Sequence, residues 1–415
     1  MPVAPKMQQI QLGREEINAR TVIRRLAAKT NLPLLVVAAL LVAYGLLVVY
    51  SVITDTLDYS FSRQLTGVGI GLVSMCLLWA FDYRKLSRLA FPLLVVTVIL
   101  ILLPLIPGLG VSSHGARNWI LIFDQQIQPS EFAKPLIILY AAALIARYEG
   151  SLKSGREYLK MLALLLIPVI CIIAQPDIGT GLVFFVMGMT ILFVGGANRK
   201  WLIITGVVII AGIVLLVAAD GVLDRAFGRD VFIQEYQMNR ILVFFDRDID
   251  ASAGGASYNL RQALIAIGSG GLFGKGFGNA TQSSLGFLPE ASTDFIFCVL
   301  AEQFGFVGTV VLLALYIILL IITFRIAFAA KSHFGTLIAA GIMGMWVFQI
   351  FVNIGMSCGV MPIIGIPLPF MSYGSSFMMV NFMALGLLCS IWARRDSKTT
   401  QMTMQMTTQL TTQLR

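Results

Sequence analysis

Several acidic and basic side chains lie within or beside apolar stretches of this chain, where they could do chemistry. Asp294 is in the segment FLPEASTDFIF, directly before aromatic and aliphatic residues. A carboxylic acid against an apolar wall has a raised pKa, which suits a general base. The alternative is that Asp294 caps the next helix, although Thr293 is an equally good cap. Glu302, two turns deeper, is either a paired acid or a buried, neutral one.

Glu131 and Lys134 lie three residues apart in the segment QPSEFAK, which opens an apolar run. This spacing puts both side chains on one face of a helix. Ionisable groups at membrane depth are costly, so each is a candidate functional residue. Two interpretations remain open. The pair is either a structural ion pair near the helix end, or Lys134 faces an anionic group of a substrate and Glu131 tunes it.

Arg117 and Trp119 are two residues apart in the segment GARNWI. A lone Trp is typical of the aromatic belt of a membrane protein. The guanidinium of Arg117 suits a phosphate or pyrophosphate headgroup. Asp177, in the connection QPDIGT, is expected to cap the helix that follows, and a functional role for it is the weaker alternative.

The stretch AIGSGGLFGKGFG, residues 266–278, is rich in glycine, as phosphate-binding loops are. It does not fit the nucleotide-binding pattern, because Ser269 replaces the first glycine and Gly276 replaces the hydroxyl residue that holds magnesium. We therefore interpret these glycines as backbone turns at a crowded surface. In GIPLPFMSYGSS, residues 365–376, two closely spaced prolines predict irregular backbone at or near membrane depth.

Membrane-spanning helices must position these residues. The chain is 58% hydrophobic and 12% charged, too little polar surface for a soluble globule of its size. Apolar runs of roughly 15 to 25 residues recur, and backbone inside a bilayer must satisfy its own hydrogen bonds, which predicts an all-α integral membrane protein. Ten spans are predicted near residues 33–53, 64–80, 89–106, 130–146, 160–174, 177–196, 201–219, 294–324, 335–358 and 370–393.

The distribution of basic residues predicts the orientation of these spans. An even number of spans places both termini on one side, and the short loops of the other side hold little beyond Arg63 and Arg117, so both termini are expected in the cytoplasm. The net charge of +9 is then an orientation signal and gives no reason to invoke nucleic acid. The predicted parts are a cytoplasmic segment 1–32, a membrane domain 33–393 with a long outer loop 220–293 between spans seven and eight, and a cytoplasmic low-complexity tail 394–415.

The five cysteines each lie inside an apolar run, without a CxxC pair, and the chain has two histidines. We interpret the cysteines as packing residues, not as disulfide partners or metal ligands. No dedicated metal cage is expected, and a requirement for a divalent cation, Mg²⁺ or Mn²⁺, is left open.

Seven segments of the chain together resemble the SEDS family (shape, elongation, division and sporulation), whose members RodA and FtsW are peptidoglycan glycosyltransferases. They are GARNWI, QPSEFAK, QPDIGTGLV, YQMNRI, YNLRQALIAIGSGGLFGKGFG, FLPEASTDFIF and GIPLPFMSYG, in family order. Several long motifs at the right separations make the resemblance specific, and it is closer to RodA than to FtsW.

The resemblance implies an enzyme of the bacterial cytoplasmic membrane that polymerises lipid II on the outer face, for cell-wall elongation and rod shape or for division. It implies that Asp294 is the catalytic residue, that Trp119 and Lys134 line the outer cavity, and that the partner is a class B penicillin-binding transpeptidase. The other candidate substrate-binding residues lie in the same segments: Arg117, Glu131, Arg240, Gln262, Glu290, Ser372 and Tyr373.

In the mechanism that we hypothesise, Asp294 is the general base for the sugar 4-hydroxyl of one lipid II. That hydroxyl attacks the anomeric carbon of a second, pyrophosphate-linked chain with inversion, and Arg117, Lys134 and Arg240 offset charge on the departing pyrophosphate. A lipid II flippase or transporter is the alternative, since it also needs intramembrane ions and proline-broken helices. A structural scaffold would not need Asp294 as an acid.

Overall fold

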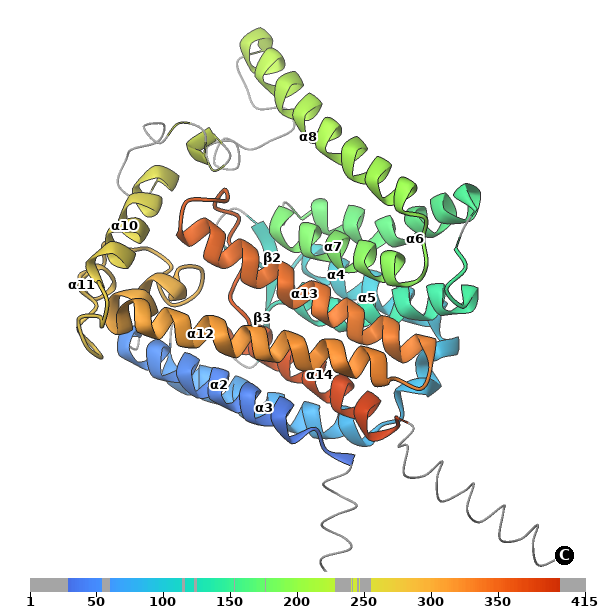
Figure 1. Cartoon of the computed structure of the whole chain (residues 1–415). Coiled ribbons are helices and arrows are strands. Elements are labelled where there is room, and N and C mark those ends of the chain that lie inside the picture. The colour runs from blue at the N-terminus through green and yellow to red at the C-terminus, as the bar shows by residue number, and fades with distance from the viewer. Residues whose placement is uncertain are drawn as a thin grey trace, which may run out of the picture.

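Long apolar helices, packed side by side, make up most of the structure (Figure 1). The computed structural model describes residues 29–53, 60–113, 116–122, 125–152, 154–175, 177–227, 240, 242–244, 246 and 255–395. The long helices are α2 (Leu32–Val52), α3 (Phe61–Ala80), α4 (Ala90–Leu102), α5 (Pro129–Ile145), α6 (Gly155–Ile173), α7 (Ile178–Val194), α8 (Arg199–Phe227), α12 (Ile296–Ala329), α13 (His333–Ser357) and α14 (Ser375–Ala393).

Each of the ten predicted spans falls on one of these helices. Six of them are long and apolar enough to cross a bilayer by themselves, namely α2, α3, α5 with the following turn, α12, α13 and α14. The mostly helical membrane fold predicted from the sequence is confirmed, while the number and orientation of the spans stay predictions.

Several helices begin a few residues from the predicted starts, and two of these differences bear on the candidate residues. The helix predicted from residue 294 begins at Ile296, with Phe295 as its N-cap and no side-chain cap, so Asp294 lies before it and does not cap it. The helix predicted from residue 370 begins at Ser375, because Phe370 and Gly374 have positive φ values of 64° and 145°. The irregular backbone predicted around the two prolines therefore extends to the start of α14.

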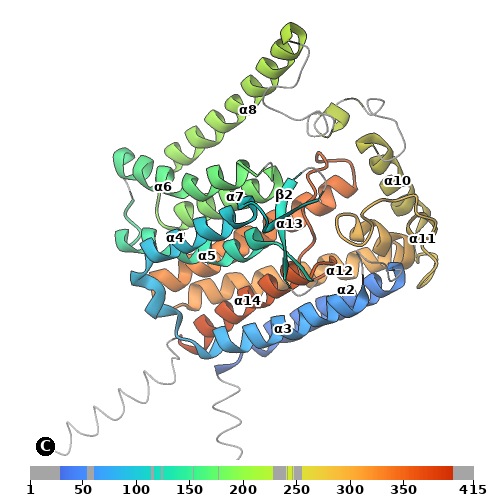
Figure 2. The same cartoon turned by 180° about the vertical axis from the view of Figure 1, so that it is seen from behind.

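A small antiparallel sheet precedes α5 and is not predicted by the sequence analysis. Its strands are β1 (Gly110–Ser113), β2 (Ala116–Ile122) and β3 (Gln125–Ile127), in the order β1-β2-β3. Val111 pairs with Trp119, and Ile120 pairs with Ile127. The sheet lies next to the first turn of α5 (Figure 2).

Glycines let α3 and α14 pack closely against each other. Helix α14 packs along α3, where a Cβ on Gly71 would meet the ring of Phe382 and a Cβ on Gly386 would meet the backbone of Met75. Such positions let helix backbones approach closely in a membrane. Helix α14 is almost wholly buried, so the segment that leads into it is anchored in the middle of the bundle.

Helix α8 leans away from the other helices in both views (Figures 1 and 2). At its start it is fixed to α6, because Trp201 stacks on Tyr158 with ring centroids 6.3 Å apart and the Tyr158 and Thr205 hydroxyls are 2.7 Å apart. It continues to Phe227, past the predicted end at residue 219. The described part of the predicted loop 220–293 contains α10 (Ala256–Ser269) and α11 (Thr281–Ser284).

Candidate functional site

Asp294 lies in a tight turn just before α12. The backbone N–H groups of Thr293, Asp294 and Phe295 all donate to the carbonyl of Glu290, over 3.3, 3.0 and 3.1 Å. Glu290 has a left-handed conformation, with φ at 52°. Its side chain accepts a hydrogen bond of 2.8 Å from the Thr293 hydroxyl. The turn thus closes on Glu290, a second acid whose charge acts on Asp294.

Three consecutive carbonyl groups of this turn are held by donors from elsewhere in the chain. The bonds run from Tyr373 N to Ser292 O (2.9 Å), from Ser372 Oγ to Thr293 O (2.6 Å) and from Asn353 Nδ2 to Asp294 O (2.8 Å). Ser372 and Asn353 are completely buried. The backbone that carries Asp294 is therefore fixed by α13 and by the segment between α13 and α14.

That segment is itself held by side chains, since its prolines prevent a helix. The Asn353 amide also donates to the carbonyl of Ile366 over 2.8 Å, and the Tyr316 hydroxyl donates to the carbonyl of Pro369 over 2.7 Å. Gln64 of α3 donates to the carbonyl of Ser372 and accepts from the N–H of Gly374. Backbone at membrane depth needs such partners when it is not helical.

The carboxylate of Asp294 lies against the bare backbone of Gly365, whose φ is 75°. A Cβ at Gly365 would be 3.0 Å from Asp294 Oδ2 and 3.6 Å from Arg240 Nη1, so the guanidinium reaches the same spot. Burial, and after it the charge of Glu290, raise the pKa of Asp294, Arg240 lowers it, and the balance moves the pKa from 3.8 to about 7. Asp294 can therefore gain and lose a proton near neutral pH, as a general base must.

Lys134 and Glu131 form a buried ion pair in the first turn of α5. Lys134 Nζ is 2.5 Å from Glu131 Oε1, and both side chains are at most 5% exposed. Lys134 also lies 5.4 Å from the centre of the Phe377 ring, on α14. Glu131 Oε2 has no hydrogen-bond partner among the described residues. The ion pair is thus formed, and a role in binding a substrate stays a prediction.

Asp177 caps α7, as the sequence predicts. Its Oδ1 accepts from Thr180 N over 3.0 Å, and its Oδ2 accepts from Asn118 Nδ2 (3.4 Å) and Gln128 Nε2 (3.3 Å). These bonds connect β2, the residue before α5 and the start of α7. Trp119, the neighbour of Asn118, is half-buried.

The structure brings some of the candidate residues together and leaves others apart. Asp294, Glu290 and Arg240 meet electrostatically, and Ser372 and Tyr373 hold the turn. The start of α5 contacts α14, since Gln128 N donates to Ser376 Oγ over 3.3 Å and Lys134 lies beside the Phe377 ring.

Two other candidate substrate-binding residues, Gln262 and Arg117, lie on α10 and β2. Gln262 is half-buried on α10. Arg117 is in β2, and its side chain lies outside the described part of the chain.

Sequence reasoning missed Asn353 and Gln64. Asn353 is an amide inside a long apolar run and Gln64 is one at the start of another, and this was the available signal, because an uncharged polar group in hydrocarbon also needs a partner. Their partners are backbone groups of an irregular segment, which no residue pattern identifies. Asn353 Oδ1 has no hydrogen-bond partner in the described part of the chain.

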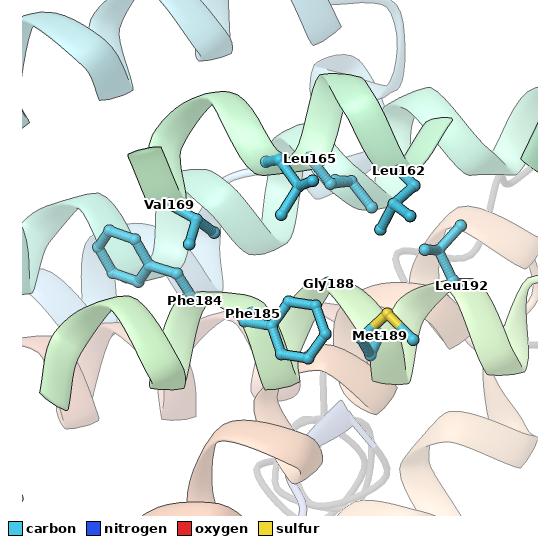
Figure 3. A pocket seen from close by; sticks show the side chains of 9 residues that line it. Leu162, Leu165, Val169, Phe184, Phe185, Gly188, Met189 and Leu192 are labelled. Carbon is cyan, nitrogen blue, oxygen red and sulfur yellow. The ribbon is translucent and has the colours of Figure 1, made fainter. Parts of the chain in front are cut away.

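Metal ligands and cavities add little to this site. Within the described ranges, no group of three His, Cys, Asp or Glu side chains could hold a metal ion. The five cysteines are all free thiols. An open volume of about 190 Å³ between α6 and α7 (Figure 3) is lined by apolar residues and by none of the candidates: Leu162, Leu165, Leu166, Val169, Phe184, Phe185, Gly188, Met189 and Leu192.

Comparison with known proteins assigns a family. The cell cycle protein family model of FtsW, RodA and SpoVE matches residues 31–397. Stage V sporulation protein E of Bacillus subtilis is 34% identical over 369 residues, which cover 87% of this chain and 96% of that protein. The peptidoglycan glycosyltransferase MrdB of Escherichia coli is 37% identical over 364 residues, which cover 87% of this chain and 93% of that protein.

Solved structures agree with this family. The rod shape determining protein RodA of Thermus thermophilus matches with a TM-score of 0.63 and 29% identity, over 89% of this chain and 98% of that chain. A chain of a peptidoglycan synthase complex that coordinates polymerization and crosslinking matches with a TM-score of 0.71 and 30% identity. That match covers 88% of this chain and 99% of the other.

Proposed function

Because this chain belongs to the cell cycle protein family of FtsW, RodA and SpoVE, we propose that it is a peptidoglycan glycosyltransferase that polymerises lipid II. One observation carries the proposal beyond the family: the backbone of Asp294 is fixed by three donors, while burial and the charge of Glu290, opposed by Arg240, bring the pKa of its carboxyl to about 7. A fixed acid that titrates near neutral pH suits a general base.

In the proposed reaction, Asp294 accepts the proton of the sugar 4-hydroxyl of an incoming lipid II. The oxygen then forms a bond to the anomeric carbon of the growing chain, the bond from that carbon to the pyrophosphate oxygen breaks, and the configuration inverts. The undecaprenyl pyrophosphate leaves with both bonding electrons. The three hydrogen bonds to the carbonyls of residues 292, 293 and 294, the backbone clamp, fix Asp294 before the substrate arrives, so no reorganisation is needed during the reaction.

Charge that gathers on the pyrophosphate needs fixed cations. Arg240 supports this role best, because its guanidinium lies beside Asp294 at Gly365. Lys134 is compensated by Glu131 at 2.5 Å, so its contribution depends on how the pair rearranges when substrate binds. Arg117 is the third proposed cation. A divalent ion bound to the pyrophosphate itself would share the task without a protein-built metal site.

The proposed setting is the bacterial cytoplasmic membrane, with segment 1–32 and tail 394–415 in the cytoplasm and loop 220–293 on the outer face. The likeness to a chain of a peptidoglycan synthase complex supports a partner that crosslinks the glycan, which we propose is a class B penicillin-binding transpeptidase. The likeness to both rod shape determining and sporulation proteins leaves growth, division and sporulation as roles to be distinguished in cells.

The test is polymer formation from purified lipid II in liposomes that contain the chain and its transpeptidase partner. Wild type is compared with Asp294→Asn and with Glu157→Gln, which neutralises an exposed acid in the first turn of α6. The proposal predicts polymer with wild type and Glu157→Gln and none with Asp294→Asn at equal folding. Equal polymer with all three would refute the role of Asp294, and lipid II translocation without polymer would favour the flippase.

A further inference from the structure

Helix α12 is interrupted at Gly305, and the glycine-rich stretch 270–276 fills the interruption. Gly305 has φ at 64° and ψ at −159°, which no helical residue adopts. Four hydrogen bonds cross the interruption: Lys275 N to Glu302 O (2.9 Å), Gly276 N to Gln303 O (3.0 Å), Phe306 N to Gly271 O (2.9 Å) and Val307 N to Leu272 O (3.1 Å). Backbone groups that a broken helix leaves without partners are thus satisfied by the loop.

Glycine is required at this junction because two backbones touch. A Cβ on Gly270 would collide with the carbonyl of Ala301, one on Gly274 with the carbonyl of Gln303, and one on Gly305 with Gly274 N. This confirms the interpretation of backbone turns at a crowded surface for Gly270 and Gly274, whereas Gly268 lies within α10 with open space around it. The contact also separates α12 into a short segment, 296–304, and a long one, 306–329.

An ion pair between a buried acid and a partly exposed lysine fastens this junction. Glu302 is completely buried, and its Oε1 is 2.5 Å from Lys275 Nζ. The same carboxylate accepts from Thr281 N (3.0 Å), Thr281 Oγ1 (2.8 Å) and Gln282 N (3.3 Å). Lys275 Nζ also donates to Thr281 Oγ1 over 2.7 Å. A carboxylate so fully buried is stable only with this many donors and a cation.

The short segment 296–304 follows directly from the turn that carries Asp294. Its far end is fixed by Glu302 to the loop and by Gln303 Nε2, which donates to Ser51 Oγ of α2 over 2.7 Å. Its near end is fixed by the hydrogen bonds to the carbonyls of residues 292–294. One short piece of helix therefore joins the Glu302 junction to the turn that carries Asp294.

We propose that Lys275 and Glu302 are positioning residues for the polymerisation reaction, acting through the short segment of α12 on Asp294. This proposal rests on the proposed function of Asp294. Without the cation of Lys275, the buried Glu302 carboxylate is uncompensated, the loop separates from α12, and the segment loses its fixed angle. A displacement of about 1 Å at a catalytic group lowers a rate by roughly 100-fold.

The experiment uses full-length protein in liposomes and the variants Lys275→Met, Glu302→Gln and the double variant. Lys200→Met, which removes an exposed lysine at the start of α8, is the control. The readouts are kcat and KM of polymerisation, the pH midpoint of kcat, and hydrogen–deuterium exchange of the peptides spanning 270–284 and 290–304. The exchange readout does not depend on activity, so it tests the junction even if wild type makes no polymer.

We expect Lys275→Met to lower kcat by about 10- to 100-fold, to shift the pH midpoint, and to speed exchange in both peptides. The double variant, which removes both charges, is expected to recover part of the loss, because breaking one side of a buried pair costs more than replacing both. Wild-type kcat, pH midpoint and exchange in Lys275→Met would overturn the proposal. So would faster exchange in 270–284 alone, since the junction would then not reach Asp294.

Discussion

Asp294 is fixed through its backbone, while its side chain changes charge near neutral pH. Burial and the charge of Glu290 raise its pKa to about 7, although Arg240 opposes them. The folded protein thus binds this proton more tightly than the unfolded chain does, whose pKa is the ordinary 3.8. Ionising Asp294 therefore lowers the free energy of unfolding, and the acid is kept at a cost in stability.

Asp294→Asn is accordingly expected to raise the melting temperature. For wild type, the free energy of unfolding falls as pH rises from the unfolded pKa of 3.8 through the folded pKa of about 7, and then levels off. Asparagine carries no charge and avoids this loss. At pH 8 the variant should melt roughly 2 °C or more above wild type in the absence of substrate, with a smaller gap at pH 5.

Tryptophan fluorescence during heating measures this difference, with Glu157→Gln as the control that should melt like wild type at both pH values. A variant that melts below wild type at pH 8 would show that ionised Asp294 stabilises the fold, contrary to the raised pKa.

At the scale of elements, α13 and the segment before α14 act as a frame for the turn that carries Asp294. Asn353 donates to two carbonyls at once, of Asp294 and of Ile366, and so joins the two pieces of irregular backbone. Asn381 accepts a comparable buried bond of 2.8 Å from Trp346 Nε1, which joins α14 to α13 and not to the carbonyls of the turn. Asn353 holds the backbone of the Asp294 turn, whereas Asn381 holds the Trp346 side chain, so variants of the two amides can be compared directly.

Asn353→Leu keeps the side-chain volume and removes both hydrogen bonds. Leaving a buried polar group without a partner costs about 1–3 kcal/mol, so both Asn353→Leu, which strands two carbonyls, and Asn381→Leu, which strands the Trp346 N–H, should lower the melting temperature. Only Asn353→Leu is expected to reduce kcat by about 10-fold or more and to shift its pH midpoint. Parallel losses of kcat in both variants would mean that Asn353 acts through general stability.

The sequence predicts the helices better than their connections, for a physical reason. Long apolar runs such as 335–358 and 201–219 indicate helices because bilayer-buried backbone has few alternatives. The strands 110–113 and 116–122 escape prediction because short strands depend on pairing, not on composition. The raised pKa of Asp294 is foreseen from its apolar neighbours, whereas the Lys275–Glu302 pair and the Asn353 bonds depend on contacts between distant residues.

At the scale of the whole molecule, the proposed chemistry requires the Asp294 turn and α11 on the outer face. Single cysteines introduced into a cysteine-free chain test this arrangement. Ser284→Cys, on α11, and Lys85→Cys, in the short helix η1 (Tyr83–Arg88), both replace exposed residues. A membrane-impermeant thiol reagent applied to intact cells should label the first and not the second, whereas the reverse pattern would invert the predicted orientation.

The central claim is that Asp294 is the base in glycan polymerisation, and its most direct test is the pH dependence of kcat/KM, which reports the ionisation of the free enzyme. The assay uses lipid II well below KM in liposomes from about pH 5.5 to about 8.5. Because the base must be ionised and its pKa is raised to about 7, kcat/KM should rise tenfold per pH unit below 7 and level off above it. A kcat/KM that is constant over this range, or that falls as pH rises through 7, would contradict the assignment of Asp294.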